Sequence, residues 1–167
     1  MEPEEKKLQT GNHTSSPMNL ALYYLKFRPR TVWEMRQYLT QKDKRFHWGD
    51  QKIEDAIRRL LELSLLDDVD FIHRFVQTNR LGKKHGRRWF VQKLLSRGIA
   101  RSIVDEHLPD DQEREQEEAY HILIDSFGAI PQPIPPALYQ KAQRKLLSRG
   151  YGWSNVLSAL ARWKKTE

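Results

Sequence analysis

The sequence contains no cysteine among its 167 residues. This absence excludes disulfide bonds, thiolate metal sites and thiol nucleophiles. It also permits a cytosolic location, because disulfides are rare in that compartment. With no covalent cross-link available, stability has to come from the packing of apolar side chains. We therefore expect a cytoplasmic protein that is held together by its core.

Long hydrophobic runs are also missing. No apolar stretch of the sequence approaches the roughly 20 residues that a membrane-spanning helix needs. The first five residues, MEPEE, are acidic and polar, whereas a signal peptide has a basic region followed by an apolar one. The sequence thus predicts a protein without a membrane partner.

Acidic residues are absent from two long segments, although the net charge of the whole chain is only +7. Residues 71–104 contain nine lysines or arginines and no acid, and residues 126–166 contain seven and no acid. Between them, residues 105–118 carry eight acids and a single arginine. Charge that is gathered in blocks creates a local field, so the two basic segments are candidates for binding an anionic partner.

Groupings typical of an active site are missing as well. The six histidines are scattered, and none has a second histidine or paired acids at the spacing of metal ligands. The adjacent acids Asp67 and Asp68 suit a helix N-terminus, where negative charge is favourable. Residues 82–86, GKKHG, lack the spacing of a phosphate-binding loop. We expect no enzyme activity, no cofactor and no metal.

Apolar residues recur at intervals of three and four, which predicts helices, and no segment alternates convincingly as a strand would. Nine helices are expected. They span about residues 17–27, 31–42, 50–64, 67–81, 84–97, a short stretch that ends before Pro109, 111–127, 137–149 and 153–164. The third should bury Ile53, Ile57, Leu60, Leu61 and Ser64, and the fifth should bury Phe90, Leu94 and Leu95.

Local signals mark the ends of several helices. Ser16 is expected to cap the first helix, and Asp50 to cap the third. Thr31 and Glu34 have the spacing of a capping box at the start of the second helix. Gly98 offers a C-terminal stop for the fifth.

A repeat organises these helices. The sequence KLLSRG occurs at residues 93–98 and again at residues 145–150, and a weaker copy aligns Leu39 with Leu94 and Leu146. We therefore predict an all-α fold of three tandem three-helix repeats that form an elongated, curved solenoid. The expected boundaries are a mobile polar tail at 1–15 and repeats at 16–66, 67–109 and 110–167, the last with a proline-rich connector at 128–136.

Four motifs together match a known family. They are RTVWEM at residues 30–35, LSLLDDVDF at 63–71, KLLSRGI at 93–99 and KLLSRGY at 145–151. In their order and separation, over about residues 20–160, the chain resembles the RecX family of bacterial regulators of the RecA recombinase. Members of that family consist of three tandem three-helix units.

The resemblance implies a non-enzymatic modulator, and an inhibitor, of RecA. It implies a protein that lies along the groove of a RecA filament on single-stranded DNA, bridges neighbouring protomers and alters ATP turnover, strand exchange and co-protease activity. We also expect a monomer. Such a role belongs to homologous recombination, DNA repair and the SOS response.

The basic segments supply the candidate contacts for the filament or for DNA. These are Arg80, Lys83, Lys84, Arg87, Arg88, Arg97, Arg101, Lys141, Arg144, Lys145 and Arg149. Lysine and arginine bind phosphates and equally meet acidic protein surfaces, and the sequence alone does not separate the two. A solvated helical face, a nucleic-acid-binding module that acts without RecA and a scaffold for another acidic protein remain alternatives.

Tryptophans raise the further possibility of stacking on nucleobases, although packing in or at the edge of the core is the simpler interpretation. Trp89 and Phe90 are adjacent, so the two rings cannot easily point the same way.

The acidic segment 105–118 is a candidate shield for the basic segments in the free protein.

Overall fold

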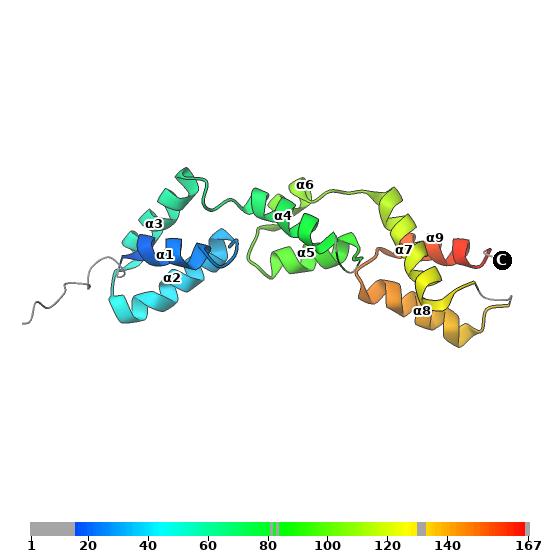
Figure 1. Ribbon diagram of the computed structural model, residues 1–167. Coiled ribbons are helices and arrows are strands. Elements are labelled where there is room, and N and C mark those ends of the chain that lie inside the picture. The colour runs from blue at the N-terminus through cyan, green and yellow to red at the C-terminus, as the bar shows by residue number, and fades with distance from the viewer. Residues whose placement is uncertain (1–15, 81, 83, 130–132, 166–167) are drawn as a thin grey trace, which may run out of the picture. The chain divides into compact units, whose positions relative to one another are not determined.

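The computed structural model describes residues 16–80, 82, 84–129 and 133–165, and in these residues it contains nine helices and no strand (Figure 1). The helices are α1 (Pro17–Leu25), α2 (Val32–Phe46), α3 (Asp50–Glu62), α4 (Asp68–Arg80), α5 (Arg87–Leu95), α6 (Arg101–His107), α7 (Gln112–Phe127), α8 (Pro136–Ser148) and α9 (Trp153–Trp163). The all-α prediction is confirmed. The predicted tail at residues 1–15 and residues 130–132 of the predicted connector lie outside the described residues.

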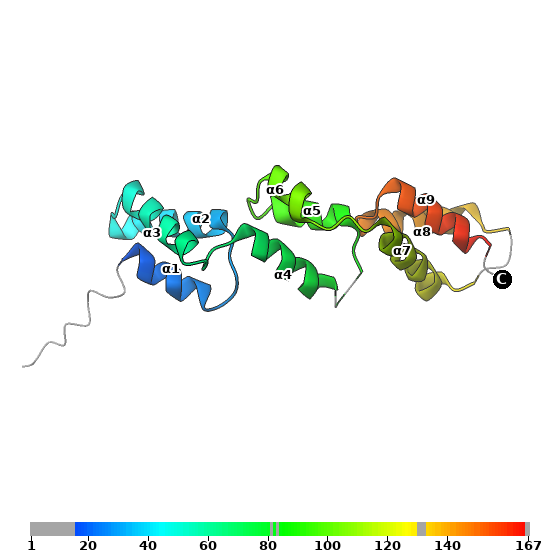
Figure 2. The same ribbon diagram turned by 90° about the horizontal axis from the view of Figure 1, so that it is seen from above.

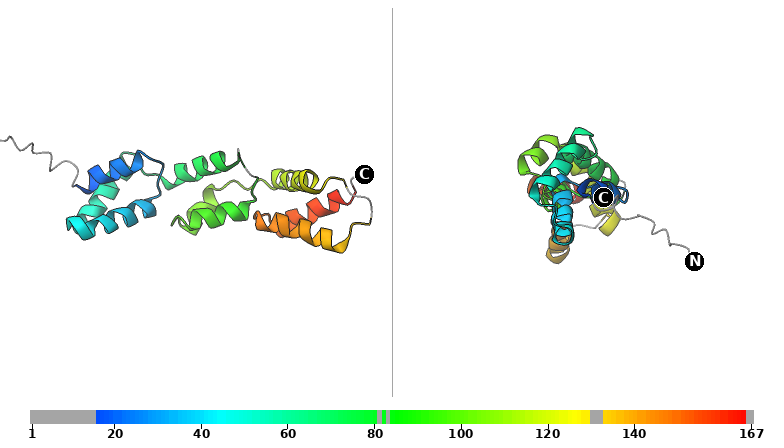
Figure 3. Two further views of the ribbon diagram at one scale, coloured as in Figure 1. Left: turned by 60° about the horizontal axis from the view of Figure 1, so that its bottom comes forward. Right: turned by 90° about the vertical axis from the view of Figure 1, so that its left-hand side faces the viewer.

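The described chain divides into two compact units, which we call unit one (up to Phe71) and unit two (from Ile72). Helix α4 begins in unit one and continues in unit two. In unit one, α1, α2 and α3 pack together, as the blue to cyan helices of Figure 3 show. Their core includes Met35, Leu39 and Leu60, all fully buried.

Two of the predicted helix caps in unit one are confirmed. The Ser16 hydroxyl accepts the Asn19 N–H at 3.2 Å. Thr31 accepts the Glu34 N–H at 3.1 Å, while the Glu34 carboxylate accepts the Thr31 N–H at 3.3 Å, which completes the capping box. These caps provide acceptors for backbone N–H groups at the N-terminal ends of the first two helices.

The prediction that Asp50 caps α3 is wrong. Gly49 is the N-cap, no side chain caps the helix, and Asp50 is its first residue. The reason lies in α2, which runs to Phe46 rather than to about residue 42 and so shortens the connection. The Asp43 carboxylate accepts the Trp48 and Gly49 N–H groups and holds this short loop.

The prediction that Leu61 and Ser64 are buried is also wrong. Leu61 is 44% exposed, and Ser64 is exposed with a left-handed φ of 53°. Helix α3 ends earlier than expected, and the Leu65 N–H donates to the Leu60 carbonyl at 2.9 Å. This turn carries Leu66, rather than Ser64, into the core, where it is 2% exposed.

In unit two, α5 is shorter than the predicted helix over 84–97. Phe90 and Leu94 are buried, but Leu95 is 37% exposed, contrary to expectation. Trp89 is only half-buried beside buried Phe90, so the two rings do point differently, as predicted. Gly98 has a left-handed φ of 77° after the end of α5, as expected of a C-terminal stop.

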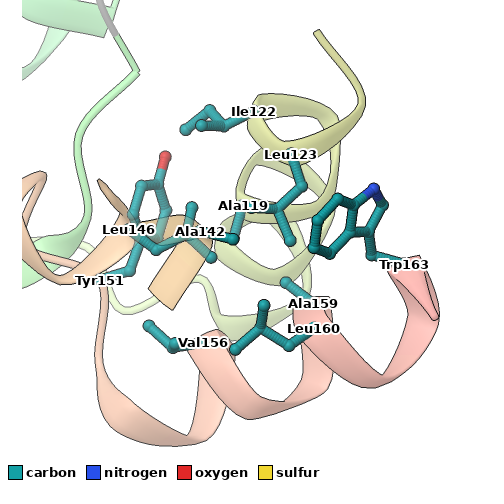
Figure 4. Packing of buried hydrophobic residues seen from close by; sticks show 10 residues of the cluster. All are labelled: Ala119, Ile122, Leu123, Ala142, Leu146, Tyr151, Val156, Ala159, Leu160 and Trp163. Atoms are coloured by element: carbon teal, nitrogen blue, oxygen red, sulfur yellow. The ribbon is translucent and has the colours of Figure 1, made fainter. Parts of the chain in front are cut away.

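Helices α7, α8 and α9 form a three-helix cluster in unit two, seen from above in Figure 2. Figure 4 shows its core, with Tyr151 and Trp163 on either side of Ala119 and Ala142. The indole N–H of Trp163 donates to the Gly128 carbonyl at 2.8 Å, so its polar group is satisfied although the ring is buried.

The positions that the repeat aligns are equivalent in all three copies. Two of these positions are buried in all three copies, with at most 3% exposure: Met35, Phe90 and Ala142 at one, and Leu39, Leu94 and Leu146 at the other. Each lies on the second helix of its repeat, so three repeats of three helices account for the fold.

Candidate functional site

Three of the candidate contacts of the middle segment lie at the starts of α5 and α6. Arg87 and Arg88 are the first two residues of α5, and Arg101 is the first residue of α6. Lys84 is half-buried in the loop before α5, whereas Lys83 lies outside the described residues. Arg88 and Arg101 are exposed and therefore accessible to a partner.

Asp105 already pairs with two of these cations. Its Oδ2 atom lies 2.6 Å from Nε of Arg101, and its Oδ1 atom lies 3.8 Å from Nη2 of Arg87. The Arg101 side chain is 63% exposed, and the Arg87 side chain is 25% exposed. Exposed ion pairs contribute little to stability, so an anionic partner can replace Asp105 at Arg101 at small cost.

Arg80, the last residue of α4, is half-buried. Burial lowers the pKa of its guanidinium, and the positive charge of nearby Arg114 lowers this pKa further. Its Nε atom is buried and has no hydrogen-bond partner among the described residues. Part of the Arg80 charge is therefore directed into the protein.

An aromatic cluster accompanies the cations of α4 and α5. The Trp89 ring stacks on His85 at 3.9 Å and on Phe75 at 6.0 Å between ring centroids. Arg97 lies 5.4 Å from the centroid of Phe75, and Lys93 lies 5.8 Å from that of Trp89. Neighbouring rings and cations thus already lie against Trp89, which favours a packing role for this tryptophan.

The candidate contacts of the last repeat lie on and just after α8. Lys141 and Arg144 are exposed. Lys145 is half-buried, with its ammonium 5.5 Å from the centroid of Phe127, and Arg149 is the half-buried C-cap. At a rise of 1.5 Å per residue, Arg144 and Lys141 lie about 7 and 12 Å before Arg149 along the helix.

The backbone brings the two basic sets together within unit two. The Gly86 N–H donates to the Arg149 carbonyl at 3.0 Å, and the Arg88 N–H donates to the Gly150 carbonyl at 3.1 Å. A Cβ atom on Gly86 would lie 2.6 Å from Cα of Tyr151, so this approach requires glycine. The start of α5 and the end of α8 are therefore adjacent.

Glu115, near the start of α7, lies at the centre of this junction and is 6% exposed. Its carboxylate accepts the backbone N–H of Arg87 and, at 2.8 Å, the amide N–H of Asn155. Burial raises the pKa of the Glu115 carboxyl above its usual value, while the two hydrogen bonds oppose the rise. Glu115 therefore joins α5, α7 and α9.

Asp68 makes the corresponding contact in unit one. Its Oδ1 atom accepts the Val32 N–H at 3.0 Å, and Val32 lies 55 residues before Arg87, which is the spacing of the repeat. Burial also raises the pKa of the Asp68 carboxyl. The cap of α4 is instead Asp67, which accepts the Val69 and Asp70 N–H groups.

Sequence reasoning missed both carboxylates as junction residues. Asp68 was interpreted as a helix-terminal acid, and Glu115 as one acid of a charged run. For Glu115 a signal was present, because it precedes Ala119 by four residues and Ile122 by seven, and both of these are buried. An acid on the buried stripe of a helix requires a partner.

Other acids of segment 105–118 pair within the helices of unit two. Glu117 forms ion pairs with Arg162 of α9 and with His121. Arg114 lies 3.3 Å from Asp111 and 3.9 Å from Glu118. Asp105 is the acid that pairs with the candidate contacts Arg87 and Arg101.

In the described part of the chain, no group of three or more histidine, aspartate or glutamate side chains is arranged to hold a metal ion. Within the same residues, no helix is both long and apolar enough to cross a membrane.

Two family models match the sequence, namely the first three-helix domain of RecX at residues 18–60 and the second three-helix domain at residues 67–108. The chain belongs to the RecX family. Regulatory protein RecX of Lactobacillus johnsonii is 31% identical over 87% of this chain, and that of Streptococcus pneumoniae strain Hungary19A-6 is 31% identical over 93%. The chain spans 53% and 58% of these two relatives.

Solved RecX structures have the same fold. The crystal structure of RecX from Lactobacillus salivarius matches 88% of this chain and 94% of its own, with a TM-score of 0.75 at 20% identity. A second structure, of regulatory protein RecX, matches 83% of this chain and 67% of its own, with a TM-score of 0.69 at 23% identity.

Proposed function

We propose that this RecX-family chain regulates the RecA recombinase by binding the filament that RecA forms on single-stranded DNA. Family membership supports a regulatory role. The observation that supports the choice of surface is the acid-free segment 71–104, whose cations Arg88 and Arg101 are exposed. Within this segment, the backbone at the start of α5 bonds to the end of α8. This contact places the last repeat, with its cations, beside the segment.

The proposed mechanism requires binding and no bond chemistry. Clustered lysines and arginines attract acidic edges of protomers, exposed DNA phosphates, or both. A chain that bridges neighbouring protomers in the filament groove opposes the changes between protomers that accompany ATP turnover. We expect inhibition of the ATPase, of strand exchange and of co-protease activity by a cytoplasmic monomer that needs no cofactor.

The first test is the ATPase rate of RecA on single-stranded DNA as this protein is titrated in. Binding to the same bare DNA is measured in parallel at two salt concentrations. We expect turnover to fall at protein levels too low to coat the DNA. A fall that begins only when bare DNA is saturated would instead favour a direct nucleic-acid-binding module, and no fall at all would favour a scaffold for another partner.

Charge reversal tests the surface itself. The triple variant Arg88→Glu, Lys141→Glu and Arg144→Glu changes three exposed side chains and should abolish inhibition of the ATPase. Arg87 is left unchanged, because its backbone and side chain take part in the junction.

The matched control makes the same change of charge at exposed positions of unit one. This variant carries Lys26→Glu, Lys52→Glu and Arg58→Glu. It should inhibit as the unaltered protein does. Equal loss in both variants would show that net charge, rather than this surface, matters.

A further inference from the structure

A hollow in unit one was not among the sites that the sequence suggested. It lies along α2 and beside α1, and its lining residues are Tyr24, Trp33, Glu34, Gln37, Tyr38, Thr40, Gln41 and Lys44. Five of these, at positions 33, 37, 40, 41 and 44, are exposed and recur at helical spacing. They therefore form one continuous face of α2.

One side of the hollow is a rigid column of aromatic rings. Tyr24 and Tyr38 stack with ring centroids 3.9 Å apart and planes at 8°. The guanidinium of Arg30 lies 3.7 Å from the centroid of Tyr24, and the ammonium of Lys42 lies 5.4 Å from that of Tyr38. The column thus carries two positive charges beside the hollow.

Trp33 forms another part of the lining and is 44% exposed. It is the second residue of α2, in the first turn that the Thr31–Glu34 capping box fixes. Packing in the core of unit one does not account for it, since that core is built from other side chains. A large aromatic ring held open to solvent on a rigid helix end is suited to stacking against a flat partner.

The charge of the hollow favours an anionic partner. Glu34 is the only acid among the lining residues. Its carboxylate already accepts the Thr31 N–H at 3.3 Å and lies 3.4 Å from Arg28. Three cations, Lys44, Arg30 and Lys42, line or flank the hollow, while Glu34 and Asp68 lie at the start of α2.

We propose that this hollow binds unpaired nucleobases of a single-stranded nucleic acid. Trp33 stacks on a base, the amides of Gln37 and Gln41 bond to base edges, and Lys44 meets the phosphate backbone. This inference goes beyond the proposed regulation of the filament, which uses the basic surface of unit two. It also gives unit one a ligand that does not depend on the recombinase.

The test is fluorescence anisotropy of a labelled oligothymidylate of about 15 nucleotides, with the full chain and without RecA. A strand of the same length in which every base is removed carries the same phosphates. We expect Trp33→Ala to weaken binding of oligothymidylate about 5-fold to 150-fold, as the loss of one stacked base does. Binding of the abasic strand should not change.

The matched control is Trp153→Ala, because Trp153 is 48% exposed but lies in unit two. Circular dichroism confirms that both variants are folded.

The proposal would be overturned if the unaltered protein bound the two strands with equal affinity, or if Trp33→Ala left the affinity for oligothymidylate unchanged. Equal affinity for double-stranded DNA, whose bases are paired, or displacement by polyglutamate at the same concentration as by oligothymidylate, would overturn it as well. These measurements contain no recombinase, so their failure leaves the proposed regulation of the filament untouched.

Discussion

Single carboxylates join consecutive repeats in this protein. Glu115 and Asp68 each accept the first N–H of a helix in the preceding repeat. An N–H group at a helix start has no partner within its own helix, so a carboxylate is a suitable acceptor there. Glu115 is buried and Asp68 is half-buried at this contact, and this burial raises the pKa of each carboxyl.

The raised pKa of Glu115 predicts a pH dependence of stability. The folded protein binds more protons than the unfolded chain between the ordinary pKa of 4.5 and the raised value. The free energy of unfolding therefore decreases as pH rises through this window. Glu115→Gln removes the titrating group, and its amide oxygen can still accept the Arg87 N–H. In urea unfolding we expect this variant to lose less stability than the unaltered protein as pH rises above 4.5.

The control for this prediction is Glu113→Gln, an exposed position in the first turn of the same helix. That variant should keep the slope of the unaltered protein. Identical slopes for the unaltered protein and Glu115→Gln would contradict the prediction, since the buried carboxyl would then not titrate differently on unfolding.

Among the helices, the contact between α5 and α8 depends on two glycines. Gly86 has an ordinary φ of −77° but no room for a side chain, and Gly150 has both a left-handed φ of 82° and Trp89 against it. Two other glycines make it possible to distinguish the effect of crowding from that of a positive φ. Gly128 has a left-handed φ of 69° with open space around it, and Gly152 has a φ of −67° with open space.

Alanine substitutions at these four positions should therefore rank in a definite order. Gly152→Ala should change the free energy of unfolding by less than about 0.5 kcal/mol. Gly128→Ala should lose about 1–3 kcal/mol through its backbone alone, because a φ of 69° with a ψ of −170° is a conformation that essentially only glycine adopts. Gly86→Ala should lose about 1–3 kcal/mol through crowding, and Gly150→Ala, which suffers both effects, should lose the most. Chemical unfolding checks the order, and a Gly150→Ala variant as stable as Gly128→Ala would contradict it.

The existence of the helices could be predicted from the sequence, while several of their ends could not. Periodic apolar residues and the Thr31 capping box are local signals, so α1 and α2 start where expected. The ends of α3 and α5 differ from expectation because distant contacts decide them. Leu66 replaces Ser64 in one core, and Gly86, whose N–H donates to the Arg149 carbonyl, lies just before the later start of α5.

At the scale of the whole molecule, charge segregation is the property that most directly concerns function. The acid-free segments and the acidic segment between them are a feature of the sequence. Their consequence depends on folding, because Asp105 pairs with Arg87 and Arg101 whereas Glu117 pairs with Arg162. Asp105 is therefore the acid whose ion pairs directly cover two of the candidate contacts.

Asp105→Asn should strengthen binding to the RecA filament, because it releases Arg87 and Arg101 for the partner. The slope of log affinity against log salt should become steeper by roughly 0.7–0.9 for each phosphate newly contacted. Asp125→Asn, at an exposed position of α7, changes the net charge equally and should have less effect. Equal effects in a filament-binding titration at several salt concentrations would show that Asp105 is no shield.

The sequence by itself determined the helical fold, the three repeats and the family, because periodicity, capping residues and repeated motifs are local patterns. It also located the basic segments. The tertiary structure decided which cations remain exposed, that Glu115 and Asp68 join repeats, and that Trp33 lines a hollow beside two stacked tyrosines. These properties depend on residues far apart in the chain, whose contacts and loss of water arise only when the helices pack.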